Sequence, residues 1–190
     1  EFFPYKHIRV NRCEADDIIG TICHTEGVVM GDGKEKILIL SGDKDFIQLQ
    51  VYSNVYQYDP IRKKMVKHND PAQYLLEHIA KGDRGDGIPN VLSADDTFVS
   101  GGRQKPMRAK RLEEIMEAVA KAEIAPDYWH HEWATGYERN EILVDLINTP
   151  DELKEQILEQ FEVDPGGRDG LFNYFVKKRL NNLIENISEF

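Results

Sequence analysis

Cysteine is scarce in this sequence, and long hydrophobic runs are missing from it. Cys13 and Cys23 are the only cysteines among 190 residues. Two cysteines are too few for a disulfide scaffold, so we expect a protein of the reducing cytoplasm. The sequence also contains no apolar run of the ~20 residues that a membrane-spanning helix needs. We therefore expect no membrane partner.

Positive charge is also in deficit, but only locally. The net charge is −10, and residues 122–165 account for all of it with twelve acidic and two basic residues. The rest of the chain is neutral and contains two basic groups that no acidic residue interrupts. The first group consists of Arg103, Lys105, Arg108, Lys110 and Arg111, and the second of Arg62, Lys63, Lys64 and Lys67. Local charge decides whether a phosphate backbone can dock, so each group is either a nucleic-acid contact or a solvated surface.

The stretch ILILSGDKDF, residues 37–46, places a hydrophobic strand directly before two acidic residues. Four consecutive aliphatic residues, Ile37–Leu40, indicate a strand that is buried on both faces, as in a parallel sheet covered by helices. Ser41 and Gly42 then turn the chain at the carboxyl end of this strand, where open α/β sheets usually hold their ligands. Because aspartates also cap turns and helices, a single one here would favour a structural role.

The wider pattern predicts an α/β protein, with a partial parallel sheet followed by a mostly helical C-terminal part. Up to residue 80 we expect strands at 8–10, 37–40, 55–58 and 65–67, and helices at 14–26 and from Asp70-Pro71 through Ile79. After Lys81 the apolar spacing predicts helices at 111–121, 151–161 and 171–187. We therefore expect two domains, residues 1–80 and 81–190.

Acidic residues gather in three clusters. They are Glu14, Asp16 and Asp17 at the start of a helix, Asp43 and Asp45 after a strand, and Asp83 and Asp86 after a helix. Each cluster alone has a structural explanation, because acids near a helix start are favoured by roughly 0.3–1 kcal/mol and Gly-Asp pairs are common in turns. Three Asp-rich clusters together are harder to explain in that way.

If the seven carboxylates converge, something must offset their repulsion. Two like charges about 4 Å apart cost roughly 1–4 kcal/mol even at high effective dielectric constants. Ligands that are all carboxylates select hard divalent ions such as Mg²⁺ or Mn²⁺. A pair of such ions activates water and stabilises the leaving oxygen of a phosphodiester. The three clusters therefore suggest metal-dependent phosphoryl transfer.

These clusters resemble known motifs in order and separation. EADD (14–17), SGDKD (41–45) and GDRGDGIP (82–89) are similar to the three later acidic motifs of the 5′-nucleases, a family that includes flap endonucleases and the 5′-nuclease domains of bacterial DNA polymerases. The segments YERNEILVDLINTP and YFVKKRLNNLIENISEF are more similar to the T-even phage ribonuclease H branch. The resemblance extends from Phe3 to Phe190 and implies a PIN-like nuclease core, located in the host cytoplasm if a phage encodes it.

The resemblance also implies roles for individual residues. Asp16 and Asp43 would ligate a first Mg²⁺, with Glu14 nearby, and Asp45 and Asp86 would serve a second. Asp83 would act on the second ion through water. Asp17 is either a further ligand or an outer group. Mn²⁺ could substitute for Mg²⁺, and the catalytic set would be Asp16, Asp43, Asp45 and Asp86.

The family follows its last acidic motif with a helix-hairpin-helix-type module that grips duplex backbone. Here 87–92 would open that module, 111–121 would form its second helix, and the basic loop 101–110 would face phosphate. Arg103, Lys105, Arg108, Lys110 and Arg111 are therefore candidate DNA contacts. Gly87 and Asn90 depart from the family's usual residues, and the hairpin is longer, so a potassium site in the hairpin is not carried over.

The family's first two acidic motifs have no counterpart before Glu14. The resemblance therefore implies the C-terminal two thirds of a 5′→3′ exonuclease and flap endonuclease. Its substrates would be DNA and RNA–DNA duplexes with 5′ ends or flaps, and we expect a monomer that cuts weakly by itself. One alternative is a non-catalytic module that docks DNA, a single-strand binding protein or a sliding clamp. A phosphatase built on Asp43 and Asp45 would leave the other two clusters unexplained.

Overall fold

The computed structural model describes residues 3–29, 36–124 and 132–190, and it divides into two compact units. The larger unit contains residues 14–150, and the smaller unit combines residues 1–13 with 151–190. The boundary expected near residue 80 falls inside the larger unit. The division into domains 1–80 and 81–190 therefore stays a prediction. Within the described ranges, no helix has both the length and the apolar character needed to cross a membrane.

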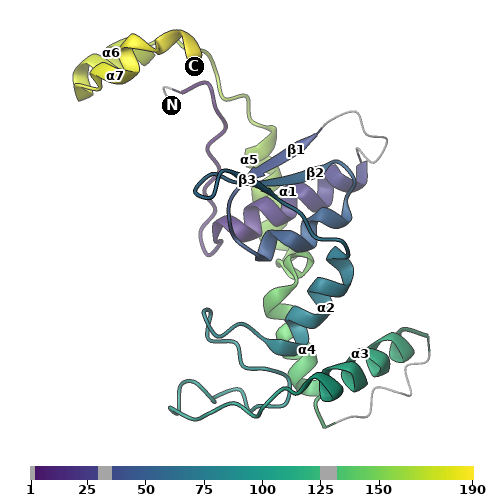
Figure 1. The fold of residues 1–190 in the computed structure, drawn as a ribbon. Coiled ribbons are helices and arrows are strands. Elements are labelled where there is room, and N and C mark those ends of the chain that lie inside the picture. Colours follow the sequence, from purple (N-terminus) through teal and green to yellow (C-terminus); the bar gives the residue numbers. More distant parts are fainter. Residues whose placement is uncertain (1–2, 30–35, 125–131) are drawn as a thin grey trace. The chain divides into compact units, whose positions relative to one another are not determined.

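The larger unit contains a small mixed sheet (Figure 1). Strand β1 (Ile37–Leu40) pairs in parallel with β2 (Val55–Asp59), with Ile37 opposite Val55. Strand β3 (Lys64–Val66) pairs antiparallel with β2 through a short turn. The buried Asp59 carboxylate shapes this turn, because its Oδ1 accepts 2.9 Å hydrogen bonds from the backbone N–H groups of Ile61 and Arg62. The expected strands near 55–58 and 65–67 are confirmed, in a mixed rather than a parallel sheet.

Strand β1 is buried on one face only, which corrects the expectation of burial on both. Ile39 is 5% exposed, whereas Leu38 is 54% and Leu40 is 66% exposed. Among the described residues β1 is an edge strand, and α1 (Ala15–Val29) and the 3₁₀ helix η1 (Asp45–Val51) contribute to the core beneath it. Alternate side chains of a strand point to opposite faces. Covering one face therefore leaves every second aliphatic residue of β1 in solvent.

One apolar core joins the sheet to the helices that carry the first two acidic clusters. Its buried members come from α1, β1, η1 and β2: Cys23, Ile39, Phe46, Leu49 and Val55. Both cysteines of the chain are free thiols, as their number suggested. This packing fixes the start of α1 and the carboxyl end of β1 on one rigid base.

A second core lies among the helices of the larger unit. Helices α2 (Pro71–Lys81), α3 (Ala109–Ile124) and α4 (Ala134–Val144) surround it, and the 3₁₀ helix η3 (Leu146–Asn148) follows. Its buried residues are Ile79, Ala80, Val91, Ile115, Val119, Trp133, Tyr137 and Val144. The expected start of α2 is confirmed, because the Asp70 carboxylate accepts a 2.9 Å bond from the N–H of Gln73. Between α2 and α3 the chain forms consecutive turns.

The smaller unit is helical, and two expectations about it are wrong. It contains α5 (Asp151–Glu162), α6 (Leu171–Lys178), α7 (Asn181–Glu185) and the 3₁₀ helix η4 (Ile187–Glu189). The single helix expected over 171–187 ends at Arg179, which takes a left-handed conformation with φ 57°. Residues 8–10, expected as a strand, form irregular backbone that the Gln160 side chain holds through both hydrogen-bonding groups of the Arg9 backbone.

Candidate metal centre

The larger unit brings carboxylates from all three acidic clusters to one place. One oxygen from each of Asp16, Asp43 and Asp45 lies within 4.8 Å of the other two. A second group of three donor atoms, from Asp45, His78 and Asp83, meets the same limit. Asp45 belongs to both groups. The two groups are thus adjacent and share one carboxylate.

The two groups border a hollow of about 140 Å³. Its lining residues are Glu14, Asp16, Asp17, Asp45, His78, Asp83, Asp86, Ile88, Leu143, Val144 and Leu146. Six of the seven predicted ligands therefore line this hollow, and Asp43 is joined to it through its group with Asp16 and Asp45. Their roles as ligands stay predictions, but their convergence does not depend on those roles.

The start of α1 presents Asp16 and holds Asp17 back. One Asp17 oxygen accepts a 2.9 Å bond from the N–H of Glu14, and the other accepts a 3.3 Å bond from the hydroxyl of Thr149. An acid in the first turn that reaches back in this way satisfies a free N–H at the helix start. Burial, followed by the charges of Asp43, Glu14, Asp17 and Asp86, raises the pKa of Asp16.

The loop after β1 is fixed by the buried side chain of Gln57 on β2. The Gln57 amide donates to the backbone oxygens of Ser41 and Asp43, at 2.9 and 2.5 Å. The Ser41 hydroxyl accepts the N–H of Asp43, and the Asp43 carboxylate accepts the N–H of Asp45. Burial raises the pKa of Asp45 to about 6; nearby carboxylates add to the rise and His78 opposes it.

The loop after α2 depends on Gly82, which has a φ of 66°. A Cβ at this position would lie 2.5 Å from the backbone oxygen of Ile88. The turn also closes through a 2.7 Å bond from the N–H of Ile88 to the backbone oxygen of Asp83. Burial alone would raise the pKa of Asp83, but bonds from the N–H of Gly85 and from His78 outweigh it and lower that pKa.

The sequence reasoning missed His78, which lies in the last turn of α2. Its Nε2 lies 3.2 Å from Asp83 Oδ2, and its Nδ1 lies 3.6 Å from Asp45 Oδ1. The His78 side chain is only 12% exposed. A histidine on a helix gives little signal by itself, and its position five residues before Asp83 was the only available clue.

The donor set suits divalent cations. The hollow holds carboxylates from three segments, and the raised pKa values of Asp16 and Asp45 reflect burial and repulsion that the protein's own groups leave uncompensated. A bound cation would relieve that repulsion. Carboxylate oxygens are the ligands that Mg²⁺ and Mn²⁺ prefer, so the residues present fit such ions.

The candidate DNA contacts divide into two kinds. Arg103, Lys105, Arg108 and Lys110 are exposed, and none of the four lies within ion-pair distance of a carboxylate of the described residues. Arg111 instead pairs with Glu114 at 3.1 Å and with Glu132 at 2.8 Å. Lys44 and Arg84, inside the acidic motifs, are both exposed.

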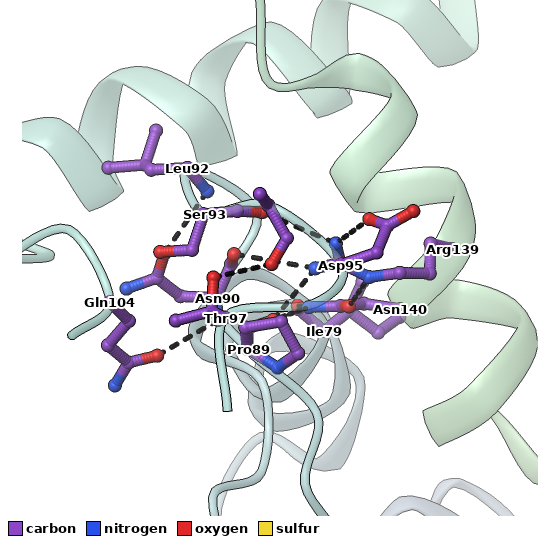
Figure 2. Close-up of polar contacts among 11 residues, drawn as sticks. Ile79, Pro89, Asn90, Leu92, Ser93, Asp95, Thr97, Gln104, Arg139 and Asn140 are labelled. Carbon is purple, nitrogen blue, oxygen red and sulfur yellow. Dashed lines mark hydrogen bonds and ion pairs between the residues drawn. The ribbon is translucent and has the colours of Figure 1, made fainter. Parts of the chain in front are cut away.

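The basic loop is tied to the turn that follows the third acidic cluster (Figure 2). The Asn90 side chain donates to the backbone oxygen of Lys105 at 2.7 Å, and the Gln104 side chain accepts the N–H of Asn90 at 3.1 Å. The Ser93 hydroxyl accepts the N–H of Lys105 at 2.8 Å. These contacts fix the first part of the basic loop against residues 90–93.

Two neighbouring residues of α4 support the same region (Figure 2). The guanidinium of Arg139 donates to the backbone oxygens of Pro89 and Ser93 and pairs with Asp95. The buried Asn140 amide donates to the backbone oxygens of Ile79 and Pro89, at 2.8 and 2.9 Å. Because Ile79 and Pro89 flank the loop that carries Asp83 and Asp86, Asn140 ties the two ends of that loop together.

Comparisons with known proteins agree with this arrangement. Residues 70–190 match the family model "T4 RNase H, C terminal", and residues 1–78 match "5′-3′ exonuclease, N-terminal resolvase-like domain". The chain is 30% identical over 197 aligned residues to ribonuclease H of Enterobacteria phage T4. That alignment covers 100% of this chain and 62% of the relative, so the chain spans less than two thirds of that protein.

A second relative and two solved structures extend the comparison. DNA polymerase I of Streptococcus pneumoniae is 33% identical over 105 residues, which cover 48% of this chain and 11% of that protein. A mutant of T5 5′-exonuclease superimposes with a TM-score of 0.52 at 19% identity, covering 82% of this chain and 69% of that one. A T5 protein co-crystallised with metal ions gives 0.51 at 19% identity, covering 82% and 62%. The structural matches identify a PIN-like α/β fold, and the family models together with the T4 relative show that this chain belongs to the T4 RNase H family of 5′–3′ exonucleases.

Proposed function

We propose that this chain is the catalytic C-terminal part of a Mg²⁺-dependent 5′→3′ exonuclease and flap endonuclease. Its reaction would be hydrolysis of a phosphodiester with two metal ions, and its role the removal of RNA primers during DNA replication. The observation that carries the proposal is the meeting of three distant acidic clusters at one hollow, with Asp45 common to two groups of donors.

The proposal assigns the catalytic carboxylates to two ions. Asp16 and Asp43 would hold the first, with Glu14 nearby, and Asp45 and Asp86 would serve the second, with Asp83 behind them. Mg²⁺ would be the usual ion, and Mn²⁺ could replace it. When bound, such a pair activates a water molecule and stabilises the leaving oxygen of a phosphodiester.

The chain's own residues would position these carboxylates before any substrate arrives. Gln57 supports this for the loop after β1, since its amide holds the backbone oxygens of Ser41 and Asp43. Asn140 supports it for the loop after α2, because it joins Ile79 to Pro89. Ligands held in place lose little freedom when an ion binds, which favours tight and specific coordination.

Nucleic-acid binding would use the exposed basic loop. Arg103, Lys105, Arg108 and Lys110 would contact phosphates of DNA or RNA–DNA duplexes with 5′ ends or flaps, and Arg111 would join them by leaving its glutamates. Contacts of this kind position a duplex without reading its sequence. A single-strand binding protein or sliding clamp would be a further partner, and the chain would act as a monomer.

The 190 residues tested by themselves should bind Mg²⁺ weakly and cut slowly. The first two acidic motifs of the family have no counterpart among these residues, and the chain spans 62% of T4 ribonuclease H. Fewer carboxylates leave less charge to hold each ion. The decisive assay therefore uses the full-length protein.

The experiment is cleavage of a labelled 5′-flap substrate in Mg²⁺, comparing wild type with Asp43→Asn and Asp86→Asn. Changes to residues that only orient a metal ligand cost about 10–100-fold in affinity or activity. Loss of a ligand itself should therefore cost at least that much. Asp96→Asn, an exposed aspartate of the turn 95–100, is the matched control. Equal rates in all four proteins would remove the catalytic assignment.

The exposed basic loop also supports a second candidate, a DNA-binding module without catalysis. Such binding would survive EDTA and fall steeply with salt, because displaced counterions dominate phosphate contacts. Replacing the four exposed basic residues by Gln should lower the salt dependence of binding by about 0.9 per lost contact. Replacing Arg62, Lys63, Lys64 and Lys67 provides a control of equal charge.

A further inference from the structure

His78 places one nitrogen ligand inside a cluster that is otherwise made of carboxylates. It belongs to the second group of donors, with Asp45 and Asp83, and it lines the same hollow as the three acidic clusters. The first group, Asp16, Asp43 and Asp45, contains oxygen donors alone. The two adjacent groups therefore differ in chemistry while sharing one residue.

The separation of His78 from Asp83 fits two ligands of one ion. Donor atoms that each lie about 2.1 Å from a metal are about 3.0 Å apart at a right angle and about 3.4 Å apart at a tetrahedral angle. The distance from His78 Nε2 to Asp83 Oδ2 is 3.2 Å, between these values. Asp45 Oδ1, 3.6 Å from Nδ1 on the other side of the ring, keeps the imidazole plane between the two carboxylates.

The surroundings also hold the imidazole in this orientation. His78 is 12% exposed and lies in the last turn of α2, whose neighbouring residues Ile79 and Ala80 are buried in the helical core. The ring of Tyr74, one turn earlier on α2, contacts the His78 ring edge-on with centroids 5.8 Å apart. A ligand whose ring is packed in this way needs little reorganisation to bind an ion.

We propose that His78, Asp83 and Asp45 form a mixed nitrogen–oxygen site that selects transition ions such as Mn²⁺, Co²⁺ or Zn²⁺ over Mg²⁺. Imidazole is a ligand of transition metals, whereas Mg²⁺ prefers oxygen donors and retains its water molecules. The oxygen-only group beside it keeps the preference for Mg²⁺. The chain would thus hold two different kinds of ion at neighbouring positions. This inference rests on the proposed function only for the presence of a metal pair.

The test is pulsed electron paramagnetic resonance of Mn²⁺ bound to the 190-residue chain. A coordinated imidazole nitrogen modulates the Mn²⁺ signal, and a site of oxygens alone does not. Wild type should show nitrogen modulation, His78→Gln should lose it, and His68→Gln should keep it. His68 is the matched control because it is exposed and its ring bonds to the backbone of Asp70.

A calorimetric titration separates selectivity from folding. His78→Gln should weaken Mn²⁺ binding by about tenfold or more and leave Mg²⁺ binding nearly unchanged, with circular dichroism showing that the variant is folded. Asp83→Asn should likewise weaken Mn²⁺ binding by about tenfold, as a second route should His78→Gln fail to fold. Absence of nitrogen modulation in wild type, or its persistence in His78→Gln, would overturn the proposal.

The outcomes also distinguish this proposal from the proposed function. A full-length protein that cleaves flaps in Mg²⁺ while the chain shows no nitrogen coupling would refute the mixed site and leave the nuclease function intact. Nitrogen coupling in a chain whose full-length protein cleaves no flap or duplex substrate would support the site and refute the function.

Discussion

Replacing Asp45 by Asn should make the metal-free chain more stable at neutral pH, although it removes a residue of the metal centre. The pKa of Asp45 is about 6 in the folded chain, against an ordinary value of 3.8, and burial is the main cause. Between these two pH values the folded chain retains a proton that the unfolded chain has released. Stability therefore falls as the pH rises from about 4 to about 6, where the ionised Asp45 meets its neighbouring carboxylates.

The expected gain can be estimated from this pKa. A difference of about 2 between 3.8 and about 6 corresponds to ~3 kcal/mol of unfolding free energy above pH 7. The Asp45 side chain is 22% exposed, so solvent screens little of this energy. Asn has nearly the same size and carries no charge. For a chain of this length, where each kcal/mol shifts Tm by about 2–4 °C, Asp45→Asn should raise Tm by up to about 10 °C.

The assay is thermal unfolding in EDTA at pH 4, 6 and 7.5, followed by circular dichroism. The gain should be absent at pH 4 and largest at pH 7.5. Saturating Mg²⁺ should reverse the order, because the wild type gains stability from metal binding and the variant gains less. Asp96→Asn is the control and should change stability by less than about 0.5 kcal/mol at every pH. An Asp45→Asn protein that is less stable than wild type in EDTA at pH 7.5 would refute the reasoning.

Three further substitutions test the fold around the centre by urea unfolding. Arg139→Ala removes donors to Pro89, Ser93 and Asp95 and should cost about 2–3 kcal/mol; an effect no larger than that of exposed Arg108→Ala would contradict this. Gly82→Ala should cost more than about 1 kcal/mol, because φ is 66° and the new Cβ would lie 2.5 Å from the Ile88 oxygen; unchanged stability would show that the loop relaxes freely. Ile39→Ala should cost about 2–5 kcal/mol and Leu40→Ala under about 0.5 kcal/mol, since only Ile39 is buried; equal costs would mean that β1 is covered on both faces.

Much of the fold followed from local signals in the sequence. The helix after Asp70-Pro71 formed as expected, because its cap and first turn are encoded in those two residues. The break after α6 gave no such signal. The N–H of Leu180 bonds to the oxygen of Phe175 at 2.9 Å, a terminating pattern that usually places glycine at the left-handed position. Here that residue is Arg179, so the apolar stripe alone suggested one continuous helix.

Burial of β1 was mispredicted for a different reason. Four aliphatic residues in a row indicate a strand covered on both faces, but coverage depends on what packs there. Within the described chain β1 is at the edge of the sheet, and its core side chain Ile39 packs with α1 and η1. The run of residues 37–40 therefore recorded an apolar strand correctly and its second face incorrectly.

The candidate site could be predicted in outline because each acidic cluster stands at the end of a regular element. The shared position of Asp45 and the contribution of His78 could not, since both depend on how α2 packs beside the loop after β1. Hydrogen bonds to Glu14 and Thr149 that occupy both Asp17 oxygens are likewise tertiary details. Sequence spacing identified which segments meet, whereas packing determines which atoms face one another.

The most direct test of the account is a Mn²⁺ titration followed by ¹H–¹⁵N NMR of the chain. Mn²⁺ broadens the signals of amides near the bound ion. Convergence of the clusters predicts that amides of residues 14–17, 43–45 and 83–86 broaden together at the same low Mn²⁺ concentration. Broadening confined to one of these stretches, or spread evenly over the acidic segment 132–164, would contradict a shared metal centre.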